Sequence, residues 1–199
     1  METIEDLQSL LEQIEQQNKD ASVFIYLPAV RYEGGLRITE RAVELIGTTD
    51  GSSQTTFTGS MIVKSNMPQI NIFRNLVLEG NGGVGVYNSA RLILYDCTVR
   101  NWDIGVYVQD GGWAGVHQCV FEQNKTALQF DSREAEMADP DYINNVFRDN
   151  GTAISLIHVP GEIALTFPDT VFSGNEIDID NPAGHPVNTQ DAVFESNAS

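Results

Sequence analysis

Hydrophobic and polar residues alternate along this chain in blocks that repeat. A seven-residue phrase occurs as QCVFEQN at 118–124, NNVFRDN at 144–150, DTVFSGN at 169–175 and DAVFESN at 191–197. Each copy has Phe at its centre, a polar residue three positions before the Phe and Asn three positions after it. A fixed period of about 20 to 50 residues is typical of stacked structural repeats.

The same register continues toward the N-terminus, where Val99 and Leu78 take the central position. Successive anchors lie 21, 22, 26, 25 and 22 residues apart, and Trp102 interrupts the Asn column. A period near 22 with three short strand-like runs per repeat predicts a parallel β-helix, in which each run forms one side of a flattened coil. Asn and Asp suit the corners, because both tolerate left-handed backbone and form local hydrogen bonds.

The first 20 residues have a different period. Apolar residues from Ile4 to Ile14 fall on one helical face, and Thr3 with Asp6 resembles a capping box. We therefore predict a capping α-helix over residues 1–20 and one all-β domain of about seven to eight coils over 21–199. Insertions at 48–59 and 133–141 would lengthen turns without disturbing the stack.

These features resemble the right-handed parallel β-helix proteins of the pectin lyase-like superfamily. IYLPAVRYEGGLRITERAVELIG at 25–47 resembles the opening rung of that family, with Val30 in place of the usual Gly, and the Asn-flanked repeat covers about 61–197. The resemblance implies a right-handed single-stranded solenoid whose N-terminal helix covers the open end of the core. It implies no single activity, because the superfamily includes lyases, hydrolases, epimerases, tailspikes and adhesins.

Charge narrows the range of partners. The chain has 11 Lys and Arg against 28 Asp and Glu, a formal charge of −17, which disfavours nucleic acid and anionic membranes. No apolar run reaches the roughly 20 residues that cross a bilayer, and the N-terminus lacks the basic segment of a signal peptide. The location stays open: cytoplasmic by default, extracellular if a leader was removed.

The strands that follow each Asn corner form the candidate functional face. Strict alternation predicts an outward column of Tyr87, Tyr107, Asp131, Ile157 and Asp180, beside Gly85, Gly105, Gln129, Ser155 and Asp178. We find no Arg or Lys in these runs, so the base and cation that a polyuronate lyase needs are missing and no catalytic residue is assigned. Asp131 and Asp180 would lie about 10 Å apart by the rung spacing, which leaves a polysaccharide hydrolase as an alternative.

The ligand-binding prediction uses the aromatic and acidic residues of this face. Tyr87 and Tyr107 beside the two glycines would form a platform for a sugar ring, or a stacking ladder that only covers the sheet. Trp113 would line a neighbouring turn or anchor it by packing. The full candidate set is Tyr87, Tyr107, Trp113, Asp131, Asp178 and Asp180.

The sequence predicts no cofactor, with Ca²⁺ at the acidic turn as an alternative that no motif supports. His117, His158 and His185 fall in different repeats without metal-ligand spacing, and the acidic turn at 131–141 lacks the spacing of a calcium loop. Cys97 and Cys119 share an inward column on adjacent coils, which predicts buried thiols or, alternatively, a disulfide between rungs.

We therefore expect a non-catalytic binding or scaffold module that presents this face to a carbohydrate or a protein. A carbohydrate-active enzyme is the first alternative. The second is a structural element that associates end to end through its last strands, unless residues 181–190 fold over that end.

Overall fold

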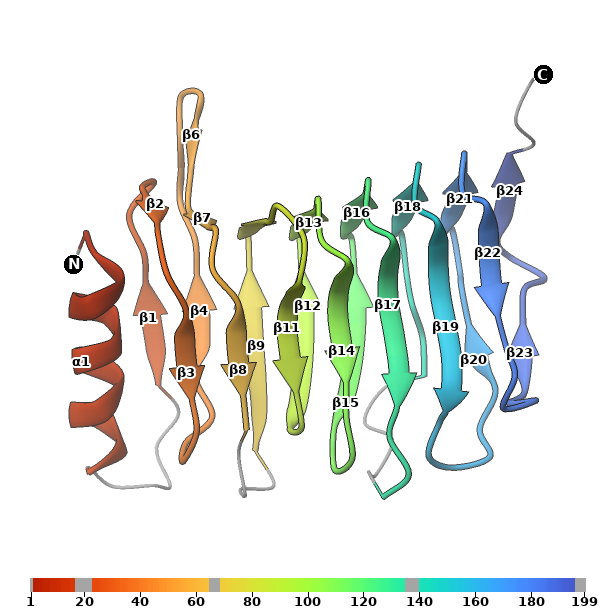
Figure 1. Cartoon of the computed structure of the whole chain (residues 1–199), viewed down its shortest axis with the longest axis horizontal. Coiled ribbons are helices and arrows are strands. Elements are labelled where there is room, and N and C mark those ends of the chain that lie inside the picture. Colours follow the sequence, from red (N-terminus) through yellow and green to blue (C-terminus); the bar gives the residue numbers. More distant parts are fainter. Residues whose placement is uncertain (1, 17–22, 65–68, 135–139, 196–199) are drawn as a thin grey trace.

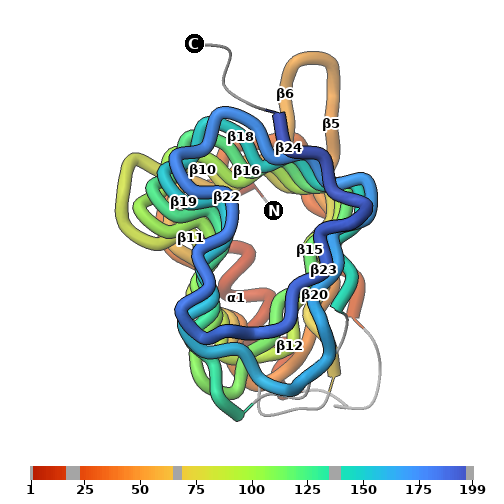
Figure 2. The backbone as a smooth tube through the Cα atoms, turned by 90° about the vertical axis from the view of Figure 1, so that its right-hand side faces the viewer, coloured from red at the N-terminus to blue at the C-terminus, as the bar shows by residue number. Residues whose placement is uncertain are grey.

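A computed structural model describes residues 2–16, 23–64, 69–134 and 140–195. The chain forms a parallel β-solenoid of about seven turns, with one α-helix at its N-terminal end (Figure 1). Viewed along its axis, successive turns superpose around a common interior (Figure 2). The predicted all-β solenoid with a capping helix is confirmed.

Three parallel sheets form the sides of the coil. Sheet A contains β1 (Phe24–Tyr26), β4 (Glu44–Ile46), β9 (Ile70–Arg74), β12 (Arg91–Tyr95) and β15 (Trp113–His117). Sheet B contains β2 (Arg31–Tyr32), β7 (Thr56–Phe57), β10 (Val77–Glu79), β13 (Thr98–Arg100), β16 (Val120–Glu122), β18 (Val146–Arg148), β21 (Val171–Ser173) and β24 (Val193–Glu195). Sheet C contains β3 (Leu36–Ile38), β8 (Met61–Val63), β11 (Val84–Asn88), β14 (Ile104–Val108), β17 (Thr126–Asp131), β19 (Thr152–His158) and β22 (Ile177–Asp180).

The remaining strands form two small two-stranded sheets. The parallel strands β20 (Leu165–Thr166) and β23 (Val187–Asn188) belong to the last turns of the coil. The antiparallel strands β5 (Thr49–Asp50) and β6 (Ser53–Gln54) form a hairpin that projects from the coil, within the predicted insertion at 48–59 (Figures 1 and 2).

The anchor residues of the repeated phrase lie directly over one another inside sheet B. Strand register places Leu78, Val99, Phe121, Phe147, Phe172 and Phe194 in one column. Ring centroids are 4.8 Å apart for Phe121 and Phe147, 5.3 Å for Phe147 and Phe172, and 5.0 Å for Phe172 and Phe194. These distances match the spacing of neighbouring strands, so the repeat follows from vertical packing in the core.

The polar residues of the phrase serve two different purposes. Five of the six residues three positions before the anchors have left-handed backbone, with φ between 52° and 57°: Asn75, Asp96, Gln118, Asn144 and Asp169. Asn124, Asn150 and Asn175, three positions after their anchors, form a ladder along the coil instead. Asn150 accepts a hydrogen bond from the backbone N of Asn124 at 3.0 Å and donates one to Phe121 O at 3.0 Å. Buried backbone groups at this corner are thus satisfied by side chains of the adjacent rung.

Trp102 extends this ladder where Asn is missing. Its backbone N donates to Asn124 Oδ1 at 3.1 Å, and its indole Nε1 donates to Leu78 O at 3.1 Å. Cys97 and Cys119 are free and buried, as the inward column predicted. Burial raises the pKa of the Cys119 thiol, which therefore stays protonated at neutral pH.

The two ends of the solenoid differ. Helix α1 (Ile4–Glu15) buries Ile4, Leu7 and Leu11, and Gln8 bonds to both backbone groups of Arg37 on β3, at 2.9 and 3.3 Å. The helix therefore satisfies part of the edge of sheet C. At the other end, Phe194 is 47% exposed. Residues 187–188 pair with β20 and so extend the coil.

Candidate functional site

The outer face of sheet C carries a column of residues of several different types. Register places Arg37, Ile62, Tyr87, Tyr107, Gln129, Ser155 and Asp180 in this column. The predicted column was right for Tyr87, Tyr107 and Asp180 but wrong at two places, because Gln129 and Ser155 occupy the positions given to Asp131 and Ile157. Thr126 and Thr152 begin their strands and pair with the position of Val84 and Ile104. The predicted alignment of these two strands with the preceding rungs was therefore displaced by two residues.

The glycines beside the tyrosines do not form an open floor. A Cβ at Gly85 would lie 2.6 Å from Gly105 O and 3.0 Å from the Trp102 ring. Both glycines are buried and allow close approach of the rungs, so the prediction that they lie open beside the tyrosines is wrong. Val84 and Ile104 are partly exposed instead.

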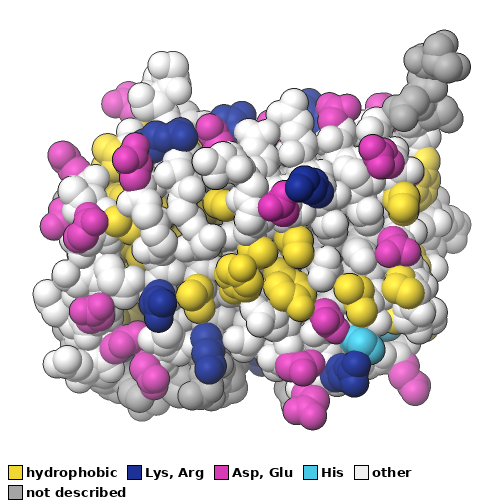
Figure 3. All heavy atoms as spheres, viewed as in Figure 1, with side chains coloured by type: hydrophobic (Ala, Val, Ile, Leu, Met, Phe, Trp, Pro, Cys, Tyr) yellow, Lys and Arg dark blue, Asp and Glu magenta, His cyan; other side chains and the backbone are white. Residues whose placement is uncertain are grey.

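An apolar patch covers the middle of this face. Figure 3 shows hydrophobic side chains gathered there, with charged groups around them. The partly or clearly exposed members on β8, β11 and β14 are Ile62, Val84, Tyr87, Ile104 and Tyr107. We call these five residues the apolar patch.

Tyr87 and Tyr107 are neighbours, but their rings do not lie flat on one another. The ring centroids are 6.3 Å apart and the planes meet at 63°. Tyr107 Oη donates to Asp131 Oδ2 at 3.4 Å. Burial, followed by the negative charge of Asp131, raises the pKa of Tyr107, so its phenol remains a neutral donor.

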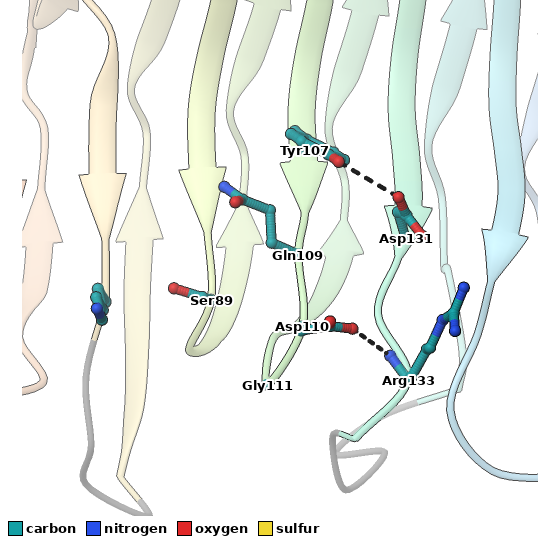
Figure 4. A pocket seen from close by; sticks show the side chains of 8 residues that line it. Ser89, Tyr107, Gln109, Asp110, Gly111, Asp131 and Arg133 are labelled. Atoms are coloured by element: carbon teal, nitrogen blue, oxygen red, sulfur yellow. Dashed lines mark hydrogen bonds between the residues drawn. The ribbon is translucent and has the colours of Figure 1, made fainter.

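An open depression of about 670 Å³ adjoins the patch at the ends of the strands. It is lined by Lys64, Ser89, Tyr107, Gln109, Asp110, Gly111, Asp131 and Arg133. Figure 4 shows Asp131 between Tyr107 and Arg133, with Asp110 below. The backbone N of Arg133 donates to Asp110 Oδ1 at 3.0 Å, which fixes the segment that carries the guanidinium.

A β-bulge places His158 next to this depression. Phe130 is paired with Leu156, whereas Asp131 is paired with His158, so β19 has one extra residue at this point. His158 Nδ1 lies 2.6 Å from Asp131 Oδ1, and Arg133 Nη2 lies 2.9 Å from His158 Nε2. The sequence did not place His158 beside Asp131, because hydrophobic alternation carries no signal of an inserted residue.

The remaining predicted residues lie elsewhere. Trp113 is on β15, fully buried, with its ring 5.1 Å from that of Phe130, so it belongs to the core and does not line the surface. Asp178 accepts from Asn175 Nδ2 at 2.9 Å, and Asp180 accepts from Ser155 Oγ at 3.4 Å, both on the last rung of sheet C. Asp131 and Asp180 therefore do not share one column.

Basic residues from outside the runs considered in the sequence reach this face. Arg37 heads the tyrosine column, and Lys64 and Arg133 line the depression. The expectation considered only the strands from Val84 onward and left out β3 and the end of β8. The net charge of the depression is therefore balanced, with two basic and two acidic side chains in its lining.

Within the described ranges, no group of three or more His, Cys, Asp or Glu residues is arranged to hold a metal ion. Of the acidic turn that was considered for calcium, Glu136 and Asp139 lie outside the described residues. Asp141 accepts a hydrogen bond from Thr166 Oγ1 at 2.5 Å. No helix in the described part of the chain is long and apolar enough to cross a membrane.

Comparison with known proteins identifies the family. The model of the right handed beta helix region matches residues 42–198, which is most of the chain. The chain therefore belongs to this family. No match was found among curated proteins or among solved structures.

Proposed function

We propose that this member of the right-handed β-helix family is a non-catalytic carbohydrate-binding module that uses the outer face of sheet C. The observation that carries the proposal is the junction of the apolar patch with the polar depression at Tyr107. A sugar ring has an apolar C–H face and a rim of hydroxyl groups. One ligand of this kind can contact both surfaces at once.

The polar groups of the depression are suited to hydroxyl recognition. Asp131 offers carboxylate acceptors, Arg133 offers a fork of donors, and Gln109 offers both types. Asp131 is held by Tyr107 and His158, so a ligand would not bear the full cost of ordering it. Tyr107 adds contact area at little entropic cost, because its side chain has only two torsions.

The carboxylate pair that the sequence suggested for hydrolysis, Asp131 and Asp180, does not support that alternative. Glycosidases generally use two carboxyl groups that flank the scissile bond. The two oxygens of Asp131 contact Tyr107 and His158, and Asp180 lies in a different column and contacts Ser155. The two carboxylates proposed from the sequence therefore do not face a common space as an aligned pair.

Calorimetric titration with a panel of neutral and acidic mono- and oligosaccharides tests the proposal. We expect at least one sugar to bind the wild-type protein, and Tyr107→Ala and Asp131→Asn to weaken it about tenfold or more, the value of one lost charge-assisted contact. Arg148→Gln, on the outer face of sheet B, is the matched control and should leave the affinity unchanged. Equal affinity in all variants, or binding to no sugar of the panel, would overturn the proposal.

A further inference from the structure

His158 stands behind the depression without lining it. Its imidazole contacts two residues that do line it, Asp131 through Nδ1 at 2.6 Å and Arg133 through Nε2 at 2.9 Å. The bulge opposite Asp131 is what brings the ring to this place. A bulge next to a candidate site is a common way to redirect a side chain.

The two contacts determine the tautomer of the imidazole. A guanidinium has only donors, so Nε2 must accept the hydrogen bond from Arg133 and can carry no proton. Nδ1 then carries the single proton and donates it to the carboxylate of Asp131. The chain Arg133, His158, Asp131, Tyr107 is therefore complete only with a neutral imidazole.

We infer that His158 is a positioning residue for the candidate sugar site, and that it fixes the Arg133 guanidinium at the edge of the depression only while its imidazole is neutral. The identity of the ligand rests on the proposed function. The arrangement of the three side chains does not depend on it.

The charged groups around His158 come from neighbouring strands. Asp131 faces Nδ1 from β17, and Arg133 faces Nε2 from the segment that follows β17. Asp110, in the turn after β14, binds the backbone of Arg133. Asp180 on β22 is bonded to Ser155 rather than to the imidazole.

A second proton on the imidazole would break one contact and keep the other. Protonated Nε2 would present a donor and a positive charge to the guanidinium, whereas the imidazolium would still be attracted to Asp131. The Arg133 side chain would turn toward solvent, although its backbone would stay bonded to Asp110. Acidification would thus remove one set of ligand donors without unfolding the rung.

Two substitutions at this position separate the chemistry from the packing. In His158→Gln the amide can donate to Asp131 and accept from Arg133, but it does not titrate. In His158→Ala both contacts are lost. His185→Gln is the matched histidine control, because His185 Nε2 faces the backbone carbonyl of Ile163 rather than the site.

The affinity of the tightest-binding sugar among glucose, galactose, mannose and their uronic acids is measured from about pH 8 to about pH 5. We expect the wild-type protein and His185→Gln to lose about tenfold in affinity on acidification. His158→Gln should bind within about threefold of wild type at neutral pH, with little change on acidification. His158→Ala should bind weakly throughout. An unchanged pH dependence in His158→Gln would overturn the inference.

Nitrogen-15 NMR of the imidazoles tests the geometry without any sugar. We expect His158 in the Nδ1–H form at neutral pH, with the Arg133 guanidinium signals shifting as Nε2 gains its proton. An Nε2–H tautomer at neutral pH would contradict the inference even if sugars bind. If no sugar of the panel binds, the proposed function fails, and the NMR result still decides the role of His158.

Discussion

The outer faces of sheets B and C are made by the same coil, yet they use their side chains in opposite ways. On sheet B, Glu79, Arg100, Glu122 and Arg148 stand in one column with alternating charge. Arg100 Nη2 lies 2.7 Å from Glu79 Oε2, and Arg148 Nη2 lies 2.5 Å from Glu122 Oε2. Each charge in this ladder has an opposite charge on an adjacent rung.

The corresponding column on sheet C contains no such alternation. Its residues run from a guanidinium through apolar and aromatic groups to an amide, a hydroxyl and a carboxylate. In-register stacking brings like positions within about 5 Å of each other, so complementary residues on successive rungs satisfy one another. In this column successive residues do not alternate in charge, so polar and aromatic groups remain available to a ligand. This difference is why we place the function on sheet C.

Breaking the core that both faces share should have the largest effect. Phe147 is fully buried between two stacked rings, and Phe147→Ala should lower the free energy of unfolding by about 3–5 kcal/mol. Phe194→Ala is the matched change at the half-exposed end of the column and should cost less than about 2 kcal/mol. Denaturant unfolding measures both values. Equal losses would contradict the continuous stack.

Making sheet C resemble sheet B should abolish binding at little cost in stability. The double variant Tyr87→Glu, Tyr107→Arg places opposite charges on adjacent rungs, which replaces an aromatic contact by an ion pair. We expect sugar affinity to fall by more than about tenfold and the free energy of unfolding to change by less than about 1.5 kcal/mol. Glu122→Gln on sheet B is the control that should leave binding intact. If the double variant still binds sugar, the aromatic pair is not required for binding and the prediction is wrong.

The smallest predicted effect is the acid response of the sheet B ladder. The hydrogen bond from Arg100 lowers the pKa of Glu79 below its ordinary value of 4.5. Its stabilising contribution is therefore present above pH 4.5 and is lost as the pH falls through the lowered pKa. Unfolding of wild type and Glu79→Gln should differ by under about 1 kcal/mol near neutral pH, and the two should converge in acid. If the two free energies of unfolding still differ in acid, the ionised Glu79 carboxylate is not the source of the difference.

The sequence predicted the parts of the molecule that repeat. The Phe column, the left-handed corners and the Asn ladder all depend on residues that recur at one period, so they could be found by alignment of the chain with itself. The N-terminal helix was found from its own apolar period, and its cap at Thr3 is present, with Asp6 N donating to Thr3 Oγ1 at 3.2 Å.

The sequence did not predict the parts of the site that lie where the repeat is irregular. A single extra residue in β19 pairs His158 with Asp131, and no apolar pattern marks it. Thr126 occupies a strand position that apolar residues fill in the preceding rungs, which displaced the predicted column. Trp113 follows two glycines and suggested a turn, but it begins β15 and points into the core.

NMR titration of the wild-type protein with the sugar panel, followed residue by residue, tests the central claim most directly. We predict that the backbone signals that shift belong to the ends of β11, β14 and β17 around Tyr107, Gln109 and Asp131, and that those of the sheet B ladder stay in place. Shifts centred on sheet B, or on the ends of the solenoid, would show that the outer face of sheet C is not the binding surface.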